Sequence, residues 1–125
     1  NAQMIAKDEQ CKAVPITQPY LLIHAETKEI DTLALMDAGF PCVGVSLAAD
    51  LIPSLPGIFS HIPMLYIIRD NDDPGRRKAE SLQQVLGRGR IISPLEGKDT
   101  GETLQAGLVD KWLVSGLGLE PVLLK

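Results

Sequence analysis

The sequence is poor in aromatic residues, cysteines and positive charge, and it contains no long apolar run. Aromatic residues make up 4% of the 125 residues, so the hydrophobic core has to be built from aliphatic side chains. No apolar run approaches the roughly 18 residues that a membrane span needs. Two cysteines are too few for a disulfide scaffold and no signal peptide is recognisable, so we expect a cytoplasmic protein. A net charge of −4 argues against a domain that binds nucleic acid through bulk positive charge.

The remaining composition is that of an ordinary globular domain. Apolar residues make up 45% of the chain and charged residues 22%, which excludes extensive disorder. The length matches one domain. We interpret Asn1-Ala2 as a scar of tag removal and residues 1–18 as a polar lead-in or linker. Residues 19–125 are expected to form one domain excised from a longer protein.

Short apolar runs alternate with segments of helical periodicity. Runs typical of buried strands occur at 20–24, 42–46, 64–68 and 90–93, with a further candidate at 122–124. Helices are predicted over 29–38, from Pro74 to Leu86 and over 99–108, with a short helix and an irregular loop within 47–62. This alternation predicts an α/β fold, a parallel sheet of about four strands with helices on both faces.

Two of the predicted helices have recognisable ends and faces. The helix over 29–38 is expected to bury one apolar side, formed by Ile30, Leu33, Ala34 and Ala38. The next long helix begins at Pro74, with Asp72 or Asp73 as its cap, and ends at Gly87.

Acidic residues follow two of the predicted strands. Asp70 and Asp72 come directly after the strand at 64–68, and Glu26 follows the strand at 20–24. Ligands of parallel sheets bind at the carboxyl ends of the strands, so these carboxylates are expected to meet there. Clustered carboxylates favour a cation, and oxygen ligands suit Mg²⁺, Mn²⁺ or Ca²⁺. Phosphoryl or nucleotidyl transfer is the chemistry that such a site serves best. A simple capping turn before Pro74 remains the alternative.

A cluster of cations begins just after the acidic pair. Five basic residues lie within fifteen positions: Arg76, Arg77, Lys78, Arg88 and Arg90. Together they would form a local patch that holds a nucleic-acid backbone or nucleotide phosphates. The alternative is a solvated helix face.

Three further polar residues lie in the predicted strands. His24 is interpreted as a buried, hydrogen-bonded core histidine, although it precedes Glu26 by two positions. Cys42 is interpreted as a small core residue, and Ser46 as a candidate for the pocket lining.

The order of these motifs resembles the Toprim domains, most closely those of bacterial, plasmid and phage primases. Residues 21–35 run through apolar positions to Glu26 and then Asp31-Thr32-Leu33-Ala34-Leu35, which is similar to the family's glutamate motif. Asp70-Asn71-Asp72-Asp73-Pro74-Gly75 is close to its Asp-x-Asp-x-Ala-Gly. Gly97-Lys98-Asp99 is similar to a Lys-Asp element of plasmid and phage members. The resemblance covers about residues 20–112.

The resemblance implies roles for individual residues. Asp70 and Asp72 would bind Mg²⁺ or Mn²⁺, and Glu26 would join them as a ligand or act as the general acid or base. These three residues would form the catalytic set. Asp99 would be a peripheral acidic group. Phosphates of nucleotide or nucleic acid would be held by four basic residues, Arg76, Arg77, Lys78 and Lys98.

The resemblance also implies a function. The domain would be a Mg²⁺-dependent, primase-like nucleotidyltransferase in DNA replication, within a larger plasmid, phage or mobile-element protein. Its partners would be a single-stranded DNA template, nucleotides, other domains of the parent protein and a helicase, with no membrane. Two alternatives stay open: a DNA-cleaving nuclease or topoisomerase, and a degenerate Toprim that binds metal or nucleotide as a regulatory module. Thr27, which stands where the family has glycine, favours the regulatory alternative.

Overall fold

A computed structural model describes residues 19–25, 29–45, 55–95 and 97–123. Nine elements follow one another within these ranges: β1 (Tyr20–His24), α1 (Glu29–Asp37), β2 (Cys42–Gly44), α2 (Leu55–Ile58), β3 (Met64–Ile68), α3 (Asp73–Leu86), β4 (Arg90–Ile92), α4 (Thr100–Gln105) and a last helix (Asp110–Gly116). The last helix is wound as a π-helix. None of the described helices is long and apolar enough to cross a membrane.

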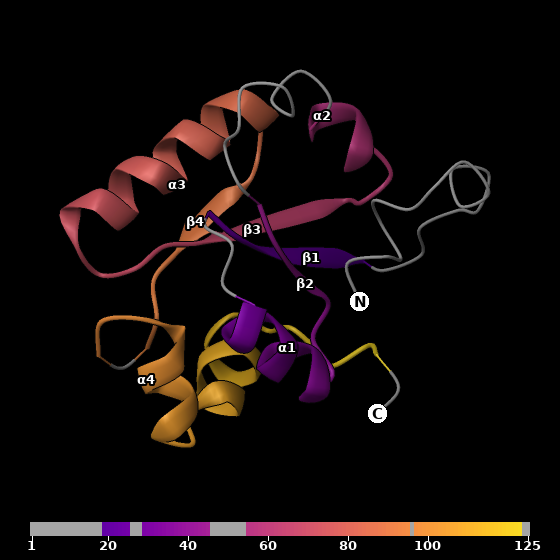
Figure 1. Ribbon diagram of the computed structural model, residues 1–125. Coiled ribbons are helices and arrows are strands. Elements are labelled where there is room, and N and C mark those ends of the chain that lie inside the picture. The colour runs from indigo at the N-terminus through magenta and orange to yellow at the C-terminus, as the bar shows by residue number, and fades with distance from the viewer. Residues whose placement is uncertain (1–18, 26–28, 46–54, 96, 124–125) are drawn as a thin grey trace.

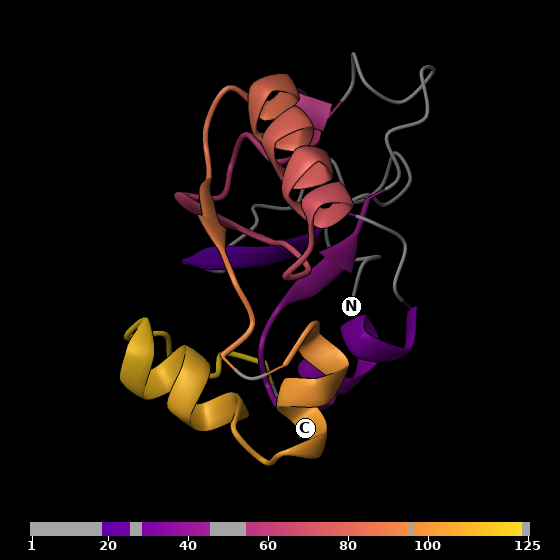
Figure 2. The same cartoon turned by 90° about the vertical axis from the view of Figure 1, so that its left-hand side faces the viewer.

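The four strands form one sheet in the order β2-β1-β3-β4, and every pairing is parallel. Parallel neighbours need crossover connections, which here are helical and cover both faces. Helices α2 and α3 lie on one side of the sheet, while α1, α4 and the last helix lie on the other (Figures 1 and 2). The predicted α/β fold with a four-stranded parallel sheet is therefore confirmed.

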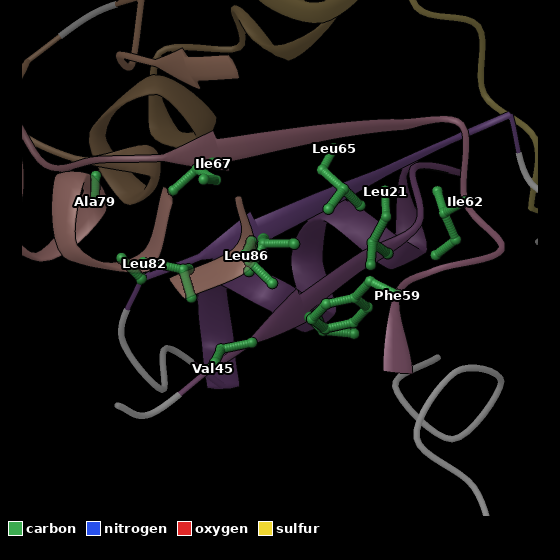
Figure 3. Close-up of a cluster of buried hydrophobic side chains, with 12 residues drawn as sticks. Leu21, Val45, Phe59, Ile62, Leu65, Ile67, Ala79, Leu82 and Leu86 are labelled. Atoms are coloured by element: carbon green, nitrogen blue, oxygen red, sulfur yellow. The ribbon is translucent and has the colours of Figure 1, made fainter. Parts of the chain in front are cut away.

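The sheet is buried on both faces, as the unbroken apolar sequences of β1 and β3 predict. Side chains of alternate strand residues separate into two clusters. The first cluster packs Leu21, Ile23, Leu65 and Ile67 against α3 (Figure 3). The second packs Leu22 and Ile68, among others, against α1 and the last helix. Trp112, from the last helix, is buried in this second cluster.

Local sequence signals determine the bounds of α3. Asp72 adopts an extended conformation as the N-cap, and its Oδ1 accepts a hydrogen bond of 2.6 Å from the backbone N of Gly75. Pro74 lies in the first turn, where its missing N–H costs no hydrogen bond. Gly87 ends the helix with a φ of +74°. The predicted cap and end of this helix are therefore confirmed, and its first residue is Asp73, one position before the predicted Pro74.

The predicted buried face of α1 is wrong for Ile30 and Leu33, whereas Ala38 packs against the second cluster as predicted. Ile30 is 83% exposed and Leu33 is 56% exposed, whereas Thr32 and Leu35 are buried. Thr32 faces the sheet because its hydroxyl lies 3.1 Å from Nδ1 of His24, and Leu35 enters the second core cluster. A polar contact with the sheet thus orients the helix.

Two further predictions need correction. The helix expected over 99–108 is limited to Thr100–Gln105, with Asp99 as its N-cap. In the predicted strand at 122–124, the described residues Val122 and Leu123 are not in a strand. Their backbone N–H groups both donate to the carbonyl of Gly39, at 2.8 and 3.0 Å, so this segment is anchored to the end of α1. Leu124 lies outside the described residues.

Candidate functional site

A small pocket lies at the carboxyl ends of β1 and β3. It is lined by His24, Ala25, Ile68, Arg69, Asp70, Gly75 and Lys78. Strands β1 and β3 are parallel neighbours, so their ends meet here, next to the first turn of α3. Glu26 follows Ala25 directly in sequence, but it lies outside the described residues, as do Thr27 and Ser46. The pocket is at the edge of the sheet where the acidic site was predicted.

Asp70 and Asp72 are brought together around Gly75. A Cβ added to Gly75 would lie 2.8 Å from the Cβ and the carbonyl oxygen of Asp70, and 2.8 Å from Oδ1 of Asp72. No side chain fits in this space without movement of the acidic loop. Glycine at position 75 therefore allows the helix to start directly against both aspartates, a requirement that the sequence alone did not reveal.

The two carboxylate oxygens of Asp72 have different partners. Oδ1 caps α3, which confirms the capping turn that the sequence left open. Oδ2 lies 3.8 Å from Nζ of Lys98, and the two side chains are 32% and 64% exposed, respectively. Capping therefore occupies one oxygen and leaves the other facing a cation at the surface.

Asp99 lies in a second acidic arrangement beside the first. Its Oδ1 caps α4 by accepting a hydrogen bond of 3.0 Å from the backbone N of Glu102, and the Glu102 carboxylate accepts one from the backbone N of Lys98. The position of a Cβ on Gly101 would be 3.2 Å from Oδ1 of Asp31 and 3.3 Å from Oδ1 of Asp99. The structure thus places the carboxylates of Asp99 and Asp31 next to Gly101, whereas the sequence placed Asp31 only within the glutamate motif.

His24 is buried and hydrogen-bonded, as predicted. Its Nδ1 lies 3.1 Å from Oγ1 of Thr32 in α1, and its Nε2 lies 3.0 Å from Oγ1 of Thr100 in α4. Both ring nitrogens are used in these contacts, so His24 fastens two helices to the end of β1 rather than offering a metal ligand.

Cys42 is also a core residue, as predicted. Its Sγ lies 3.6 Å from Nδ1 of His24. Burial raises the pKa of the Cys42 thiol to about 12, and the negative charge of Asp31 adds to this, while a hydrogen bond with Thr32 opposes it. The thiol is therefore protonated at neutral pH and is a poor nucleophile.

The basic patch is smaller than the sequence suggested. Arg76, Arg77 and Lys78 are exposed on the first turns of α3, and Arg76 lies 3.4 Å from Asp73. Arg88 is not part of this surface, because its guanidinium donates to the carbonyls of Phe59 at 2.5 Å and Ile62 at 2.7 Å. These bonds hold the segment before β3 against the end of α3.

The donor set suits a hard divalent cation. Within the described residues, no group of three or more His, Cys, Asp or Glu side chains is close enough to hold a metal ion. Asp70 and Asp72 supply oxygen donors from one loop. Mg²⁺ is commonly bound by one or two carboxylates, with phosphate and water oxygens completing its shell. The residues present therefore fit Mg²⁺ or Mn²⁺ in the presence of a phosphate substrate, and they do not fit a structural zinc site.

Part of the chain is similar in sequence to a phage protein. No family model matches the chain. The Gene 57 protein of Mycobacterium phage D29 is 35% identical over 71 residues, which make up 57% of this chain and 47% of that protein. The chain thus spans about half the length of this curated relative.

Solved primase structures share the fold. The primase fragment of the bacteriophage T7 primase-helicase protein superposes with a TM-score of 0.60 at 22% identity, over 86% of this chain and 46% of that one. A second match has the same TM-score and identity and covers 84% of this chain and 56% of the other. It comes from a complex of the T7 lagging-strand DNA polymerase with primase domains bound to an RNA/DNA hybrid and dTTP. The chain therefore shares its four-stranded α/β fold with the T7 primase fragment.

Proposed function

We propose that this chain is the Mg²⁺-dependent nucleotidyl-transfer domain of a primase-like DNA replication protein. One observation carries the proposal. Asp70 and Asp72 lie together at the carboxyl end of β3, next to the end of β1, which Glu26 follows, in a fold shared with the T7 primase fragment. Parallel α/β sheets bind their ligands at this edge.

The acidic and basic residues of the site would have different roles. Asp70 and Asp72 would hold Mg²⁺ or Mn²⁺, and Glu26 would serve as a third ligand or as the general acid or base. When bound, the ion supplies charge neutralisation of the phosphates and a lower pKa for a coordinated hydroxyl. Lys98 would contact nucleotide phosphates as a point charge, and Asp99 would remain a peripheral acidic group.

The exposed cations of α3 would hold the template. Arg76, Arg77 and Lys78 begin directly after the acidic loop, so a strand bound across them passes close to Asp70. Such contacts with the phosphate backbone are independent of sequence. Other domains of the longer protein and a helicase would act together with this domain. DNA cleavage by the same carboxylates is the alternative activity, and the likeness to primases favours synthesis.

The test is Mg²⁺ and Mn²⁺ binding to this chain by calorimetry, with and without a nucleoside triphosphate. The decisive variant is Asp70→Asn with Asp72→Asn, because asparagine is as good an N-cap as aspartate and preserves α3 while removing both charges. Asp73→Asn is the matched control, since Asp73 is a neighbouring exposed carboxylate outside the pair.

We expect saturable binding by the wild type and by Asp73→Asn, and its loss in the double variant. Equal binding by the double variant would remove Asp70 and Asp72 from the site. Absence of binding by the wild type even with nucleotide present would overturn the metal-dependent function.

A further inference from the structure

We propose that Asn71 is a positioning residue that holds Lys98 where its ammonium meets the phosphates of a bound nucleoside triphosphate. The inference rests on the proposed function and names a residue to which neither the motif nor the charge pattern assigns a role. It starts from two loops that are distant in sequence and joined in the structure.

Asn71 connects the loop between β3 and α3 to the loop before α4. Its backbone N donates to the carbonyl of Lys98 at 2.6 Å, and its side-chain Nδ2 donates to the carbonyl of Gly97 at 2.9 Å. One residue therefore binds two consecutive carbonyls of the opposite loop. The two residues that flank Asn71 are the proposed metal ligands Asp70 and Asp72.

The Lys98 loop is held from its other side as well. Gly97 has a φ of +73°, a conformation that favours glycine, and a Cβ there would collide with the side chain of Glu102. The backbone N of Lys98 donates to the Glu102 carboxylate. The backbone of Lys98 is thus fixed at its N by Glu102 and at its carbonyl by Asn71, so the side chain is the part that can reorient.

The Lys98 ammonium faces the carboxylate that would bind the metal. Its Nζ lies 3.8 Å from Oδ2 of Asp72, and the Lys98 side chain is 64% exposed. A divalent cation on Asp72 and this ammonium have the same sign of charge and compete for the same carboxylate. Phosphate oxygens that share the cation offer the ammonium another anion within side-chain reach. A fixed backbone keeps the ammonium within that reach.

The experiment is a double-mutant cycle on nucleotide affinity. Binding of a non-hydrolysable ATP analogue in the presence of Mg²⁺ is measured for the wild type, Asn71→Ala, Lys98→Ala and the double variant. We expect Lys98→Ala to weaken binding about fivefold, as for an exposed charge pair. Loss of the Asn71 side-chain hydrogen bond is expected to weaken binding about threefold.

The cycle distinguishes positioning from a general structural role. If Asn71 acts through Lys98, then Asn71→Ala has no further effect in the Lys98→Ala background. Gln83→Ala is the matched control, because the Gln83 amide also donates to a glycine carbonyl, that of Gly89 at 2.8 Å, at the opposite end of α3. We expect this variant to bind nucleotide like the wild type.

The possible results separate this inference from the function on which it rests. A wild type that does not bind nucleotide overturns the proposed function and the inference with it. A wild type that binds, together with an Asn71→Ala effect of equal size in both backgrounds or no effect at all, overturns the inference alone. Melting temperatures of all variants identify any loss of binding that comes from unfolding.

Discussion

Gly75→Ala tests whether the acidic loop needs the close approach of α3. The added methyl group would lie 2.8 Å from three atoms, and two of them, the Cβ and the carbonyl oxygen of Asp70, are fixed to the backbone. They cannot move out of the way by a side-chain rotation alone. The helix or the loop has to shift, and the cap bond between Gly75 N and Asp72 Oδ1 is strained with it.

The expected cost comes from opposing terms of known size. Alanine in a helix is favoured over glycine by roughly 0.5–1 kcal/mol. Overpacking costs about 1–3 kcal/mol, and a damaged N-cap adds about 1 kcal/mol. We therefore expect a net loss of about 2 kcal/mol, which for a domain of this size lowers the melting temperature by about 6–10 °C.

The assay is thermal unfolding followed by circular dichroism, with Gly57→Ala as the matched control. Gly57 is also a helical glycine, in α2, but nothing lies within 4 Å of the Cβ that it would gain. This substitution is expected to be neutral or to stabilise by about 0.4–1 kcal/mol. Gly75→Ala should thus lower the melting temperature, whereas Gly57→Ala should leave it unchanged or raise it. A Gly75→Ala protein that melts at or above the wild-type temperature would refute the argument from close approach.

Three other experiments test separate parts of the structure. Arg88→Ala leaves the carbonyls of Phe59 and Ile62 without their charged donor, so it should lower the free energy of unfolding by about 2 kcal/mol in denaturant titrations. Arg77→Ala, at an exposed position, should lower it by less than about 0.5 kcal/mol. Equal losses would contradict the assignment of Arg88 to these carbonyls. Arg76→Glu with Arg77→Glu should weaken single-stranded DNA binding and flatten its salt dependence in fluorescence anisotropy, and an unchanged slope would exclude this surface. In a Cys11→Ser background, the native Cys42 thiol should resist a thiol reagent at pH 8. Rapid labelling of the native protein would contradict the burial of Cys42. Because the pKa of the Cys42 thiol rises from 9.0 to about 12 on folding, its ionisation favours the unfolded chain. The free energy of unfolding should therefore fall as the pH rises through that interval.

Features encoded by neighbouring residues could be predicted from the sequence. The bounds of α3 follow from a capping aspartate, a first-turn proline and a glycine after the last turn, all within sixteen positions. The strands followed from short apolar runs, and their parallel arrangement followed from the alternation with helices. The position of Asp70 and Asp72 at the end of β3 could be predicted in the same way, because both residues closely follow the apolar run of that strand.

Features that depend on contacts between distant segments could not be predicted. Hydrophobic periodicity placed Ile30 and Leu33 in the core, but the contact of Thr32 with His24 turns α1 the other way. The clustering of basic residues in the sequence predicted that Arg88 lies on a binding surface. In the structure its guanidinium donates hydrogen bonds to carbonyls of the segment before β3. The link between Asn71 and the Lys98 loop likewise joins residues that no sequence period relates.

The strand order also has a consequence for how the molecule assembles. Strands β1 and β2 are joined through α1, and β3 and β4 through α3, so each half is a local β-α-β unit. The two halves meet along the pairing of β1 with β3, in which Tyr20 lies opposite Met64. Contacts distant in sequence carry a larger loop-closure cost and tend to form late. We therefore expect Leu82→Ala, inside the second half, to slow folding, and Leu21→Ala, at the seam, mainly to speed unfolding. The pocket at the carboxyl ends of β1 and β3 spans this pairing, so a half-folded chain has no complete site. A ligand bound there would stabilise the state in which the two halves are docked.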